Sequence, residues 1–439
     1  MISQGRPALA TRSMLRVDDS QQPPATGLTL EPFRATRYFG VDLAAVTSPP
    51  YDVVEPDHCF SLESADPHNV VRLILPRVAN LEDRYRHAAG VWHEWVNEGV
   101  LRSDDTPALW VYEQTSPTGT LVGMVGTIPI DRPTAVLPHE DVMPGPVRDR
   151  AELMDAVGAN LEPILLVHDP SPRFKEEEQV ALTTELVDHS RLTPPMIELQ
   201  TDDHARHRLW AIRDPAVHRQ VAADLSTRSA LIADGHHRFA AYQHIQVARR
   251  LGQHSRSPQA WDRGLALVVD GHAHPLTLGP IHRTVQGLDL AKALETAGPG
   301  IGQQPLASLA AATRWLAEVP PVPAMVVTDG EHWAGLTAPE AAAWVPRPDR
   351  SAKWRSLPTA VLHDLLIPHR WHAADDDIAY HHDIPGALRV VASGGIAVLL
   401  PALPLTTVID RAAAGERLPR KSTSFGPKPR TGLLMREFD

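Results

Sequence analysis

The chain has 439 residues and a net charge of −11, from 42 Lys and Arg against 53 Asp and Glu. This acidic balance is unlike the clustered basic surface of nucleic-acid-binding proteins, so we expect no nucleic-acid partner. The apolar runs are far shorter than the ~20 residues of a membrane-spanning helix, so we expect no membrane association. The single cysteine, Cys59, cannot form a disulfide within the chain. It suits a reducing compartment, and we expect a cytoplasmic protein.

The chain is long enough for more than one domain, because a single core rarely exceeds about 250–300 residues. We expect a disordered extension over 1–27, without the apolar stretch of a signal peptide. A main α/β domain over 28–285 and a second α/β unit over 286–405 follow. The segment over 406–439 carries a basic loop that we expect to return to the site. The expected fold class is α/β, with mixed α+β sheets.

Hydrophobic periodicity and turn residues predict the elements of the main domain. In chain order these are a strand over 70–75, a helix over 81–100, a hairpin of 108–114 and 121–130, a helix over 148–157, a strand over 163–167, paired strands over 194–201 and 206–214, a helix over 216–225, a strand over 230–233, a helix over 238–251, and strands over 264–269 and 275–278. This order is typical of a mixed sheet with helices packed on it.

Alanine-rich helices alternating with strands predict the second unit. The helices are expected over 290–297 and 306–318, and the strands over 324–328, 332–336 and 395–401. The basic C-terminal segment is expected to contain a strand over 432–435.

The first candidate site is Asp234-Gly235-His236-His237-Arg238, where an apolar strand meets a glycine and a helix. The first amides of a helix have no partner within it, and the helix dipole favours an anion there. Gly235 allows close approach of the backbone to a ligand, and Arg238 can offer a two-pronged guanidinium. Asp234 could hold a metal, orient a histidine or cap the helix. A capped helix with surface histidines is the alternative.

A second candidate is His139-Glu140, followed by Arg148, Asp149 and Arg150. The His-Glu pair next to a proline could supply a general base or a metal ligand. Arg150 could bind phosphate. The alternative is an acid that starts a helix, with surface ion pairs of little energetic weight.

A third candidate is the run 421–430, in which Lys421, Ser422, Thr423 and Lys428 could form a phosphate clamp. The order of residues is not that of a P-loop, and a solvated basic tail is the alternative. Asp52, after Pro49-Pro50-Tyr51, lies in a rigid loop and is a further candidate ligand group. The pair His282-Arg283 follows a strand and could join the anion site.

Together these motifs resemble those of the domain-of-unknown-function 1015 family, over about residues 31–434. The matching stretches are Pro49-Pro50-Tyr51-Asp52-Val53-Val54, 69–76, His139-Glu140 with Asp149-Arg150, Ala159-Asn160 with Pro163-Ile164, the 234–238 turn, His282-Arg283, and Lys421-Ser422-Thr423 with Pro427-Lys428 and Gly432-Leu433. The chain departs from the family's pattern at Ser424 and Gly426, where bulkier residues are usual.

The turn at 235–238 is also similar to the nucleotide-binding turn of the ParB and sulfiredoxin superfamily, which includes free serine kinases. This resemblance implies a ParB/sulfiredoxin-like nucleotide-binding unit. His236 stands where sulfiredoxin has its cysteine, so sulfiredoxin activity is not expected. The sequence also lacks a helix-turn-helix with a basic recognition face, which a DNA-binding ParB would need.

The preferred hypothesis is a small-molecule kinase that transfers phosphate from ATP or ADP to a hydroxyl such as that of free serine. Glu140 or Asp52 would accept the hydroxyl proton, with His139 beside them, and Asp234 would hold Mg²⁺. The alternative is a nucleotide-binding switch or partner-binding protein without chemistry. A metal-dependent hydrolase is disfavoured, because the adjacent His236 and His237 cannot face one metal from one helix. The substrate and the oligomeric state stay open.

Overall fold

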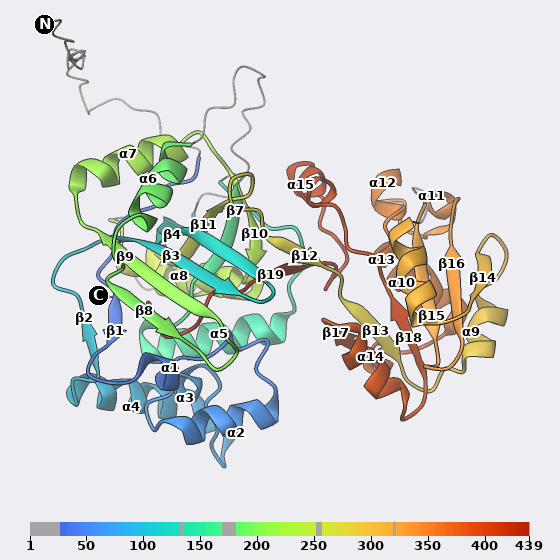
Figure 1. Cartoon of the computed structure of the whole chain (residues 1–439), viewed down its shortest axis with the longest axis horizontal. Coiled ribbons are helices and arrows are strands. Elements are labelled where there is room, and N and C mark those ends of the chain that lie inside the picture. Colours follow the sequence, from blue (N-terminus) through green and yellow to red (C-terminus); the bar gives the residue numbers. More distant parts are fainter. Residues whose placement is uncertain (1–26, 132–134, 169–180, 252–256, 319–321, 439) are drawn as a thin grey trace, which may run out of the picture.

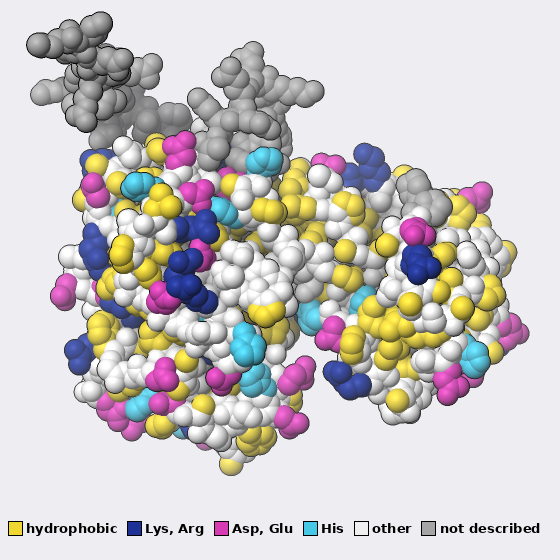
Figure 2. Space-filling model, in the orientation of Figure 1, with side chains coloured by type: hydrophobic (Ala, Val, Ile, Leu, Met, Phe, Trp, Pro, Cys, Tyr) yellow, Lys and Arg dark blue, Asp and Glu magenta, His cyan; other side chains and the backbone are white. Residues whose placement is uncertain are grey.

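The computed structural model describes residues 27–131, 135–168, 181–251, 257–318 and 322–438. The extension expected over 1–27 therefore lies, apart from Gly27, outside the described residues. Figure 1 shows a large lobe with one broad sheet and a small lobe with a second sheet. In Figure 2 a hollow separates the two lobes, and acidic and basic side chains are interspersed over this face. The expectation of a mixed α/β fold is confirmed.

The large lobe is built on an eight-stranded sheet with the order β5-β10-β7-β11-β4-β3-β9-β8. The pairs β10–β5 and β11–β7 are parallel, and the other neighbours are antiparallel. The strands are β3 (Leu109–Ser116), β4 (Gly119–Pro129), β5 (Val136–Leu137), β7 (Ile164–His168), β8 (Ile197–Gln200), β9 (Arg206–Ile212), β10 (Ala230–Asp234) and β11 (Arg263–Asp270). The predicted hairpin is β3–β4, and the other predicted strands from 163 to 269 are present within one to three residues at most ends.

Helices pack around this sheet, and the first four of them lie below it in Figure 1. They are α1 (Leu43–Val46), α2 (Pro56–Ala65), α3 (Val71–Ile74), α4 (Arg84–Asn97), α5 (Pro144–Val157), α6 (Leu182–Arg191), α7 (Pro215–Leu225) and α8 (His236–Leu251), with 3₁₀ turns at Leu81–Asp83 and Ala260–Asp262. The strands β1 (Thr36–Tyr38) and β2 (Leu101–Ser103) form a separate two-stranded antiparallel sheet. The predicted helices over 148–157, 216–225 and 238–251 correspond to α5, α7 and α8.

The strand predicted over 70–75 is wrong, because these residues form the helical turn α3. Asn69 starts the turn: its Oδ1 accepts the amide of Val71 at 2.9 Å, and its Nδ2 donates to the carbonyl of Ala45 at 2.7 Å. Val71, Leu73 and Ile74 are buried, whereas Arg72 and Leu75 are partly exposed. A short, mostly buried run does not distinguish a strand from a helical segment.

The small lobe contains a six-stranded sheet with the order β14-β16-β15-β18-β13-β17. Its strands are β13 (His282–Val285), β14 (Gly302–Leu306), β15 (Ala324–Thr328), β16 (Trp333–Thr337), β17 (Ile378–His381) and β18 (Ile396–Leu399), and its helices include α9 (Leu290–Thr296), α10 (Leu309–Glu318), α11 (Ala341–Trp344), α12 (Ala352–Arg355), α13 (Pro358–Val361) and α14 (Ile384–Val391). A π-helical segment spans Leu362–Trp371 and a 3₁₀ turn spans Asp375–Asp377. Because β13 pairs with β17 and β18, we propose a domain boundary before His282 and not after Val285.

The C-terminal segment runs from α15 (Leu405–Ala413) back to the large lobe. There β19 (Ser424–Gly426) pairs with β12 (Thr277–Gly279), and β20 (Arg436–Glu437) pairs with β6 (Ala159–Asn160). The strand predicted over 432–435 is displaced, because Gly432 has a φ of +91° and turns the chain. Within the described ranges no helix is both long enough and apolar enough to cross a bilayer.

Candidate functional site

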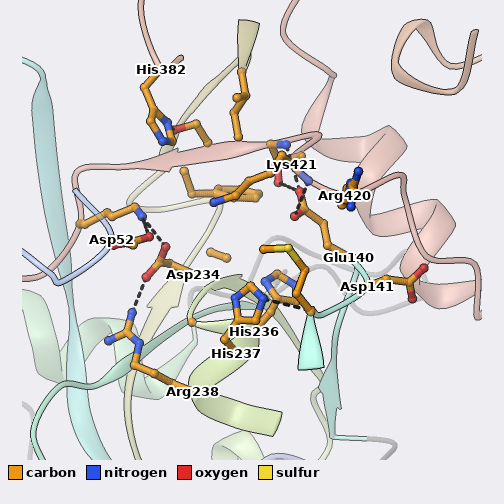
Figure 3. A pocket seen from close by; sticks show the side chains of 18 of the residues that line it. Asp52, Glu140, Asp141, Asp234, His236, His237, Arg238, His382, Arg420 and Lys421 are labelled. Atoms are coloured by element: carbon orange, nitrogen blue, oxygen red, sulfur yellow. Dashed lines mark hydrogen bonds and ion pairs between the residues drawn. The ribbon is translucent and has the colours of Figure 1, made fainter. Parts of the chain in front are cut away.

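A cleft of about 720 Å³, open to solvent, lies where the two lobes and the C-terminal segment meet (Figure 3). The lining comes from the loop after Pro50, the loop after β5, the β10–α8 turn, Ile281, His382 and the C-terminal loop. The residues are Tyr51, Asp52, Glu140, Asp141, Met143, Ala233, Asp234, Gly235, His236, His237, Arg238, Ile281, His382, Arg420, Lys421, Thr423, Ser424, Phe425 and Lys428.

The floor of the cleft is the turn between β10 and α8, as the sequence predicts. Gly235 has a φ of +93°, and a Cβ there would lie 2.9 Å from Cγ2 of Ile164. Both facts require glycine at this position. Phe239, Ala241 and Tyr242 are buried and anchor α8, which begins at His236 on the cleft. Its first amides lack partners within the helix and can bind an anion.

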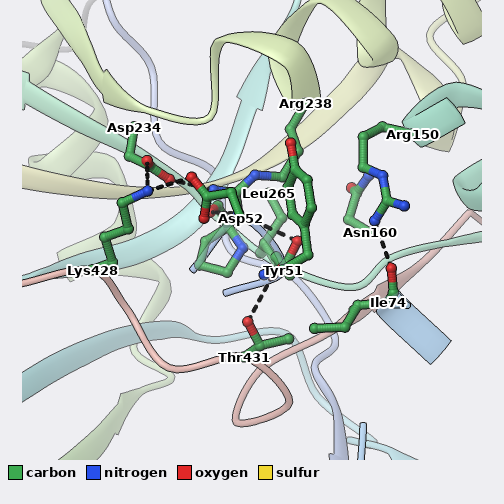
Figure 4. Close-up of polar contacts among 12 residues, drawn as sticks. Tyr51, Asp52, Ile74, Arg150, Asn160, Asp234, Arg238, Leu265, Lys428 and Thr431 are labelled. Atoms are coloured by element: carbon green, nitrogen blue, oxygen red, sulfur yellow. Dashed lines mark hydrogen bonds and ion pairs between the residues drawn. The ribbon is translucent and has the colours of Figure 1, made fainter. Parts of the chain in front are cut away.

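Asp234, at the end of β10, lies between two cations (Figure 4). Its Oδ1 is 2.8 Å from the Nζ of Lys428, and its Oδ2 is 2.5 Å from a guanidinium nitrogen of Arg238. Lys428 also pairs with Asp52, so its ammonium bridges two carboxylates. Burial alone would raise the pKa of Asp234, but the charges of Lys428 and Arg238 outweigh it and hold that pKa well below its usual range.

Arg238 is buried, and its guanidinium contacts a backbone carbonyl and two carboxylates. It donates to the carbonyl of Pro163 at 2.7 Å and lies 3.8 Å from Glu162. Burial would lower its pKa, but the nearby carboxylates, Glu162 first, raise it. In the structure Arg238 lines the cleft and pairs with Asp234, and the phosphate binding expected of it stays a prediction.

Glu162 was not predicted as a site residue, yet it organises one wall. Its Oε1 accepts the amide of Tyr51 at 3.1 Å and the hydroxyl of Thr431 at 2.8 Å. The Tyr51 ring lies over Arg150, with 4.4 Å from the guanidinium carbon to the ring centre. Burial raises the pKa of Tyr51 to about 12, so its hydroxyl stays protonated at neutral pH. A buried acid in an apolar run, Leu161-Glu162-Pro163-Ile164, was the available signal.

Glu140 points at the C-terminal loop and not freely into the cleft. Its Oε2 accepts the amide of Lys421 at 3.1 Å, and its Oε1 accepts the amides of Ser422 and Thr423 at 2.9 and 3.1 Å. The hydroxyl of Thr423 adds a fourth bond at 2.9 Å. Glu140 therefore fixes this loop beside α8.

The histidines around the turn contact one another and the loops beside it. The rings of His139 and His236 meet edge to face at 4.5 Å between centres, and His139 also bonds the Thr423 hydroxyl at 2.7 Å. Burial lowers the pKa of both rings. His237 accepts the amide of Met143 at its Nε2, which places its proton on Nδ1, and burial lowers its pKa too. These rings add no charge for a phosphate at neutral pH.

Five predicted residues lie outside the cleft lining, namely His139, Arg150, His282, Arg283 and Ser422. Arg150 lines a neighbouring pocket with Cys59, Arg84 and Tyr85, where it pairs with Asp149 and donates to Ile74 O. His282 accepts the amide of Leu400 at 3.2 Å in the small lobe. Arg283 lies behind the C-terminal loop, donates to the carbonyls of Arg420 and Lys421, and supports the loop from the far side.

Other lining residues were missed by the sequence predictions. His382 follows β17 and bonds Ser424 at 2.9 Å, so the small lobe contributes directly to the cleft. Asp141 and Arg420 are the sequence neighbours of predicted residues. This proximity was the only indication in the sequence that they line the cleft. His382 carried none, because its approach depends on the packing of the two lobes.

The Mg²⁺ site expected at Asp234 does not fit the residues present. Both oxygens of Asp234 face cations, and Asp52 is also paired with Lys428. Across the described residues no group of three or more His, Cys, Asp or Glu side chains is placed to hold a metal ion. The positive charges of Lys428 and Arg238 would repel a divalent cation at Asp234, so the reaction proposed below uses no metal held by this residue.

The family model described as "Protein of unknown function (DUF1015)" matches residues 30–360. The chain belongs to this family. For this DUF1015 chain, the match includes Asp52, Glu140 and the β10–α8 turn, and it ends before His382 and the C-terminal loop. No curated protein matches the chain.

Among solved structures, the chain resembles a free serine kinase in complex with AMP, at 15% identity and a TM-score of 0.36, over 69% of this chain and 87% of that one. A conserved hypothetical protein from Pyrococcus furiosus gives the same identity and score, over 69% and 90%. SbnI with a C-terminal truncation from Staphylococcus aureus gives 8% identity and a TM-score of 0.37, over 71% and 87%. Scores this low do not establish a shared function.

Proposed function

We propose that the chain binds the phosphate groups of a nucleotide, ATP or ADP, in this cleft and transfers a phosphoryl group to a small-molecule hydroxyl such as that of free serine. The observation that carries the proposal is the convergence of three features in one cleft. These are the N-terminus of the long helix α8, the ammonium groups of Lys421 and Lys428, and a carboxylate, Asp52. Phosphoryl transfer requires mainly positioning and charge neutralisation, which this set supplies.

The phosphates would lie on the first amides of α8, opened by Gly235. Lys421 and Lys428 line the same space from the C-terminal loop. Burial would lower the pKa of Lys428, but Asp234 and Asp52 raise it, so the ammonium stays charged. The Nδ1–H of His237 is a further neutral donor, since its Nε2 is already an acceptor. Charge on phosphate oxygens would thus face two ammonium groups and the positive end of a helix.

In the proposed reaction the acceptor's hydroxyl oxygen attacks the terminal phosphorus. A new P–O bond forms as the bond between that phosphorus and the bridging oxygen breaks, and the shortened nucleotide leaves with that electron pair. The hydroxyl proton passes to a carboxylate. Asp52 is the better placed of the two expected acceptors. Among the described residues it pairs with Lys428 alone, whereas Glu140 accepts four hydrogen bonds.

The test is to incubate the purified chain with ATP or ADP and serine, with and without Mg²⁺, and to detect phosphoserine by mass spectrometry. Asp52→Asn should bind nucleotide normally and lose turnover by about 10²–10⁴-fold, as for loss of a general base. Asp57→Asn, an exposed carboxylate in the first turn of α2, is the matched control and should keep full activity. No phosphoserine, and no nucleotide turnover with a wider panel of hydroxyl compounds, would remove the kinase proposal.

A nucleotide-binding switch is the second candidate, and one observation favours it. Each carboxylate that could act as a base is already paired, Asp52 with Lys428 and Glu140 with the loop amides. Such a site can bind without reacting. Calorimetry should then show that the wild type binds nucleotide. If the wild type has no turnover, so that Asp52→Asn changes none, the result supports the switch.

A further inference from the structure

Three consecutive amides of the C-terminal loop converge on one point of the cleft. The amides of Lys421, Ser422 and Thr423, with the hydroxyl of Thr423, surround the carboxylate of Glu140 at 2.9–3.1 Å. We call these four donors the loop nest. Successive amides that point inward form a concavity that binds anions. Lys421 adopts a φ of +57°, a conformation that residues other than glycine rarely take, and this bends the loop around the carboxylate.

The loop nest is held in shape from its other side. Arg283, fully buried, donates to the carbonyls of Arg420 and Lys421 at 3.2 and 2.8 Å. In a trans peptide the N–H and C=O groups point in opposite directions. The same two peptides therefore direct the amides of Lys421 and Ser422 away from Arg283 and toward Glu140. The Ser422 hydroxyl also donates to Pro419 O at 2.5 Å.

Glu140 contacts the loop nest through its side chain, and its backbone is held by other contacts. Its backbone is fixed elsewhere: the amide of Leu418 donates to His139 O at 2.7 Å, and Arg417 donates to Glu140 O at 3.1 Å. Rotation of the side chain can thus empty the loop nest without moving either strand of backbone. Asp141, Lys421 and Arg420 line the cleft beside it.

We propose that the loop nest is a phosphate subsite occupied in the free protein by Glu140, and that a phosphate group of the ligand displaces this carboxylate into the cleft. The inference rests on the proposed function for the identity of the ligand. Phosphate and carboxylate are both oxyanions, but phosphate carries more charge and more acceptor oxygens. Lys421 would add a direct ion pair. Glu140 would leave its four hydrogen bonds only when ligand is bound. Phosphate binding would therefore produce a free carboxylate in the cleft.

The probe is pyrophosphate, measured by calorimetry with the full chain. Glu140→Ala removes the resident carboxylate, so the wild-type cost of emptying the loop nest disappears and affinity should rise about tenfold. Asp141→Ala is the matched control: it removes a neighbouring exposed carboxylate that does not contact the loop nest. A larger gain for Glu140→Ala than for Asp141→Ala supports the proposal. An equal or smaller change overturns it, because Glu140 would then act only through its charge or by holding the loop.

A second measurement covers the case in which Glu140→Ala fails to fold. Amide resonances of the ¹⁵N-labelled wild type are followed during a pyrophosphate titration. Shifts at Lys421, Ser422 and Thr423 support the loop nest. Shifts confined to residues 235–238 overturn it while leaving phosphate binding at α8 intact. Shifts at neither place also overturn it, and the phosphoserine assay then judges the kinase proposal separately.

Discussion

The ammonium of Lys428 lies 2.8 Å from Oδ1 of Asp234, although the two residues are far apart in the sequence. Lys428 also contacts Asp52, so one side chain of the C-terminal loop joins the Pro50 loop to the end of β10. Asp234 is buried and Lys428 half-buried, whereas Asp52 is exposed at the cleft. The site is therefore complete only when the C-terminal segment has docked on the large lobe.

Replacing Lys428 with Met should destabilise the chain by about 1–3 kcal/mol, because two carboxylates would lose their shared cation while Arg238 still compensates Asp234. Native Asp234 has a depressed pKa, so its stabilising effect is present above the unfolded pKa near 3.8 and is lost as pH falls through the lower folded value. In the variant the folded pKa rises toward the unfolded value, so the loss of stability on acidification should be smaller and should end at a higher pH. Unfolding free energies between about pH 2 and 5 measure this.

Lys353→Met, at an exposed position in α12, is the control and should leave both the free energy and its pH profile unchanged. An unaltered acid profile in Lys428→Met would show that Arg238 alone holds the pKa of Asp234 down.

Gly235→Ala should destabilise the chain and abolish tight phosphate binding. The residue has a φ of +93°, and the added Cβ would lie 2.9 Å from Cγ2 of Ile164, so we expect a cost of about 1–3 kcal/mol. Gly158 has a φ of +73° with open space around it, so Gly158→Ala should cost only about 1 kcal/mol and keep binding. Equal losses of stability would mean that the Ile164 contact relaxes without cost. Denaturant unfolding and pyrophosphate calorimetry provide the two readouts.

The sequence predicted the turn at 234–238 because every determinant of that turn is local. An apolar strand, a glycine with positive φ and an amphipathic helix follow one another within about 20 residues. The C-terminal lysines were also expected at the site, through the family resemblance and their charge. The roles of Glu140 and Arg283 were not predictable, since they depend on which side of a loop each group approaches. That geometry arises from the docking of three distant segments.

The strand expected over 70–75 is wrong, and the phosphate-binding role expected for Arg150 stays a prediction for a residue outside the cleft lining. A short, mostly buried run does not distinguish a strand from a helical turn, and the side chain of Asn69 accepts the amide of Val71 at the start of this turn. Arg150 belongs to a matching family stretch, Asp149-Arg150, but it lies inside α5 and lines the neighbouring pocket. Membership of a motif therefore did not indicate which helix face meets the cleft.

Arg283→Lys should weaken pyrophosphate binding several-fold with a modest loss of stability. A single ammonium cannot donate in the plane of the guanidinium to Ile281 O, Arg420 O and Lys421 O together, so the two peptides behind the loop nest lose their alignment. Arg389→Lys, an exposed arginine on α14, is the control. Binding equal to that of the wild type would show that the loop keeps its shape without Arg283.

The stability of the small lobe should depend on pH through His282. Its Nδ1 accepts the amide of Leu400, and burial, helped by the charge of Arg283, lowers its pKa to about 4. The folded pKa lies below the unfolded value near 6.5, so the unfolded chain binds the proton first and stability is lost as pH falls from about 6.5 toward 4. From pH 7 to 5 this one group accounts for about 2 kcal/mol.

His282→Asn keeps an acceptor for the Leu400 amide but does not titrate. Its unfolding free energy should therefore fall by about 2 kcal/mol less than that of the wild type between pH 7 and 5, even if its value at pH 7 is slightly lower. His87→Asn, at an exposed position in α4, should reproduce the wild-type pH dependence. If His282→Asn and the wild type lose the same free energy on acidification, other buried histidines such as His363, whose pKa burial lowers to about 3, dominate the acid response.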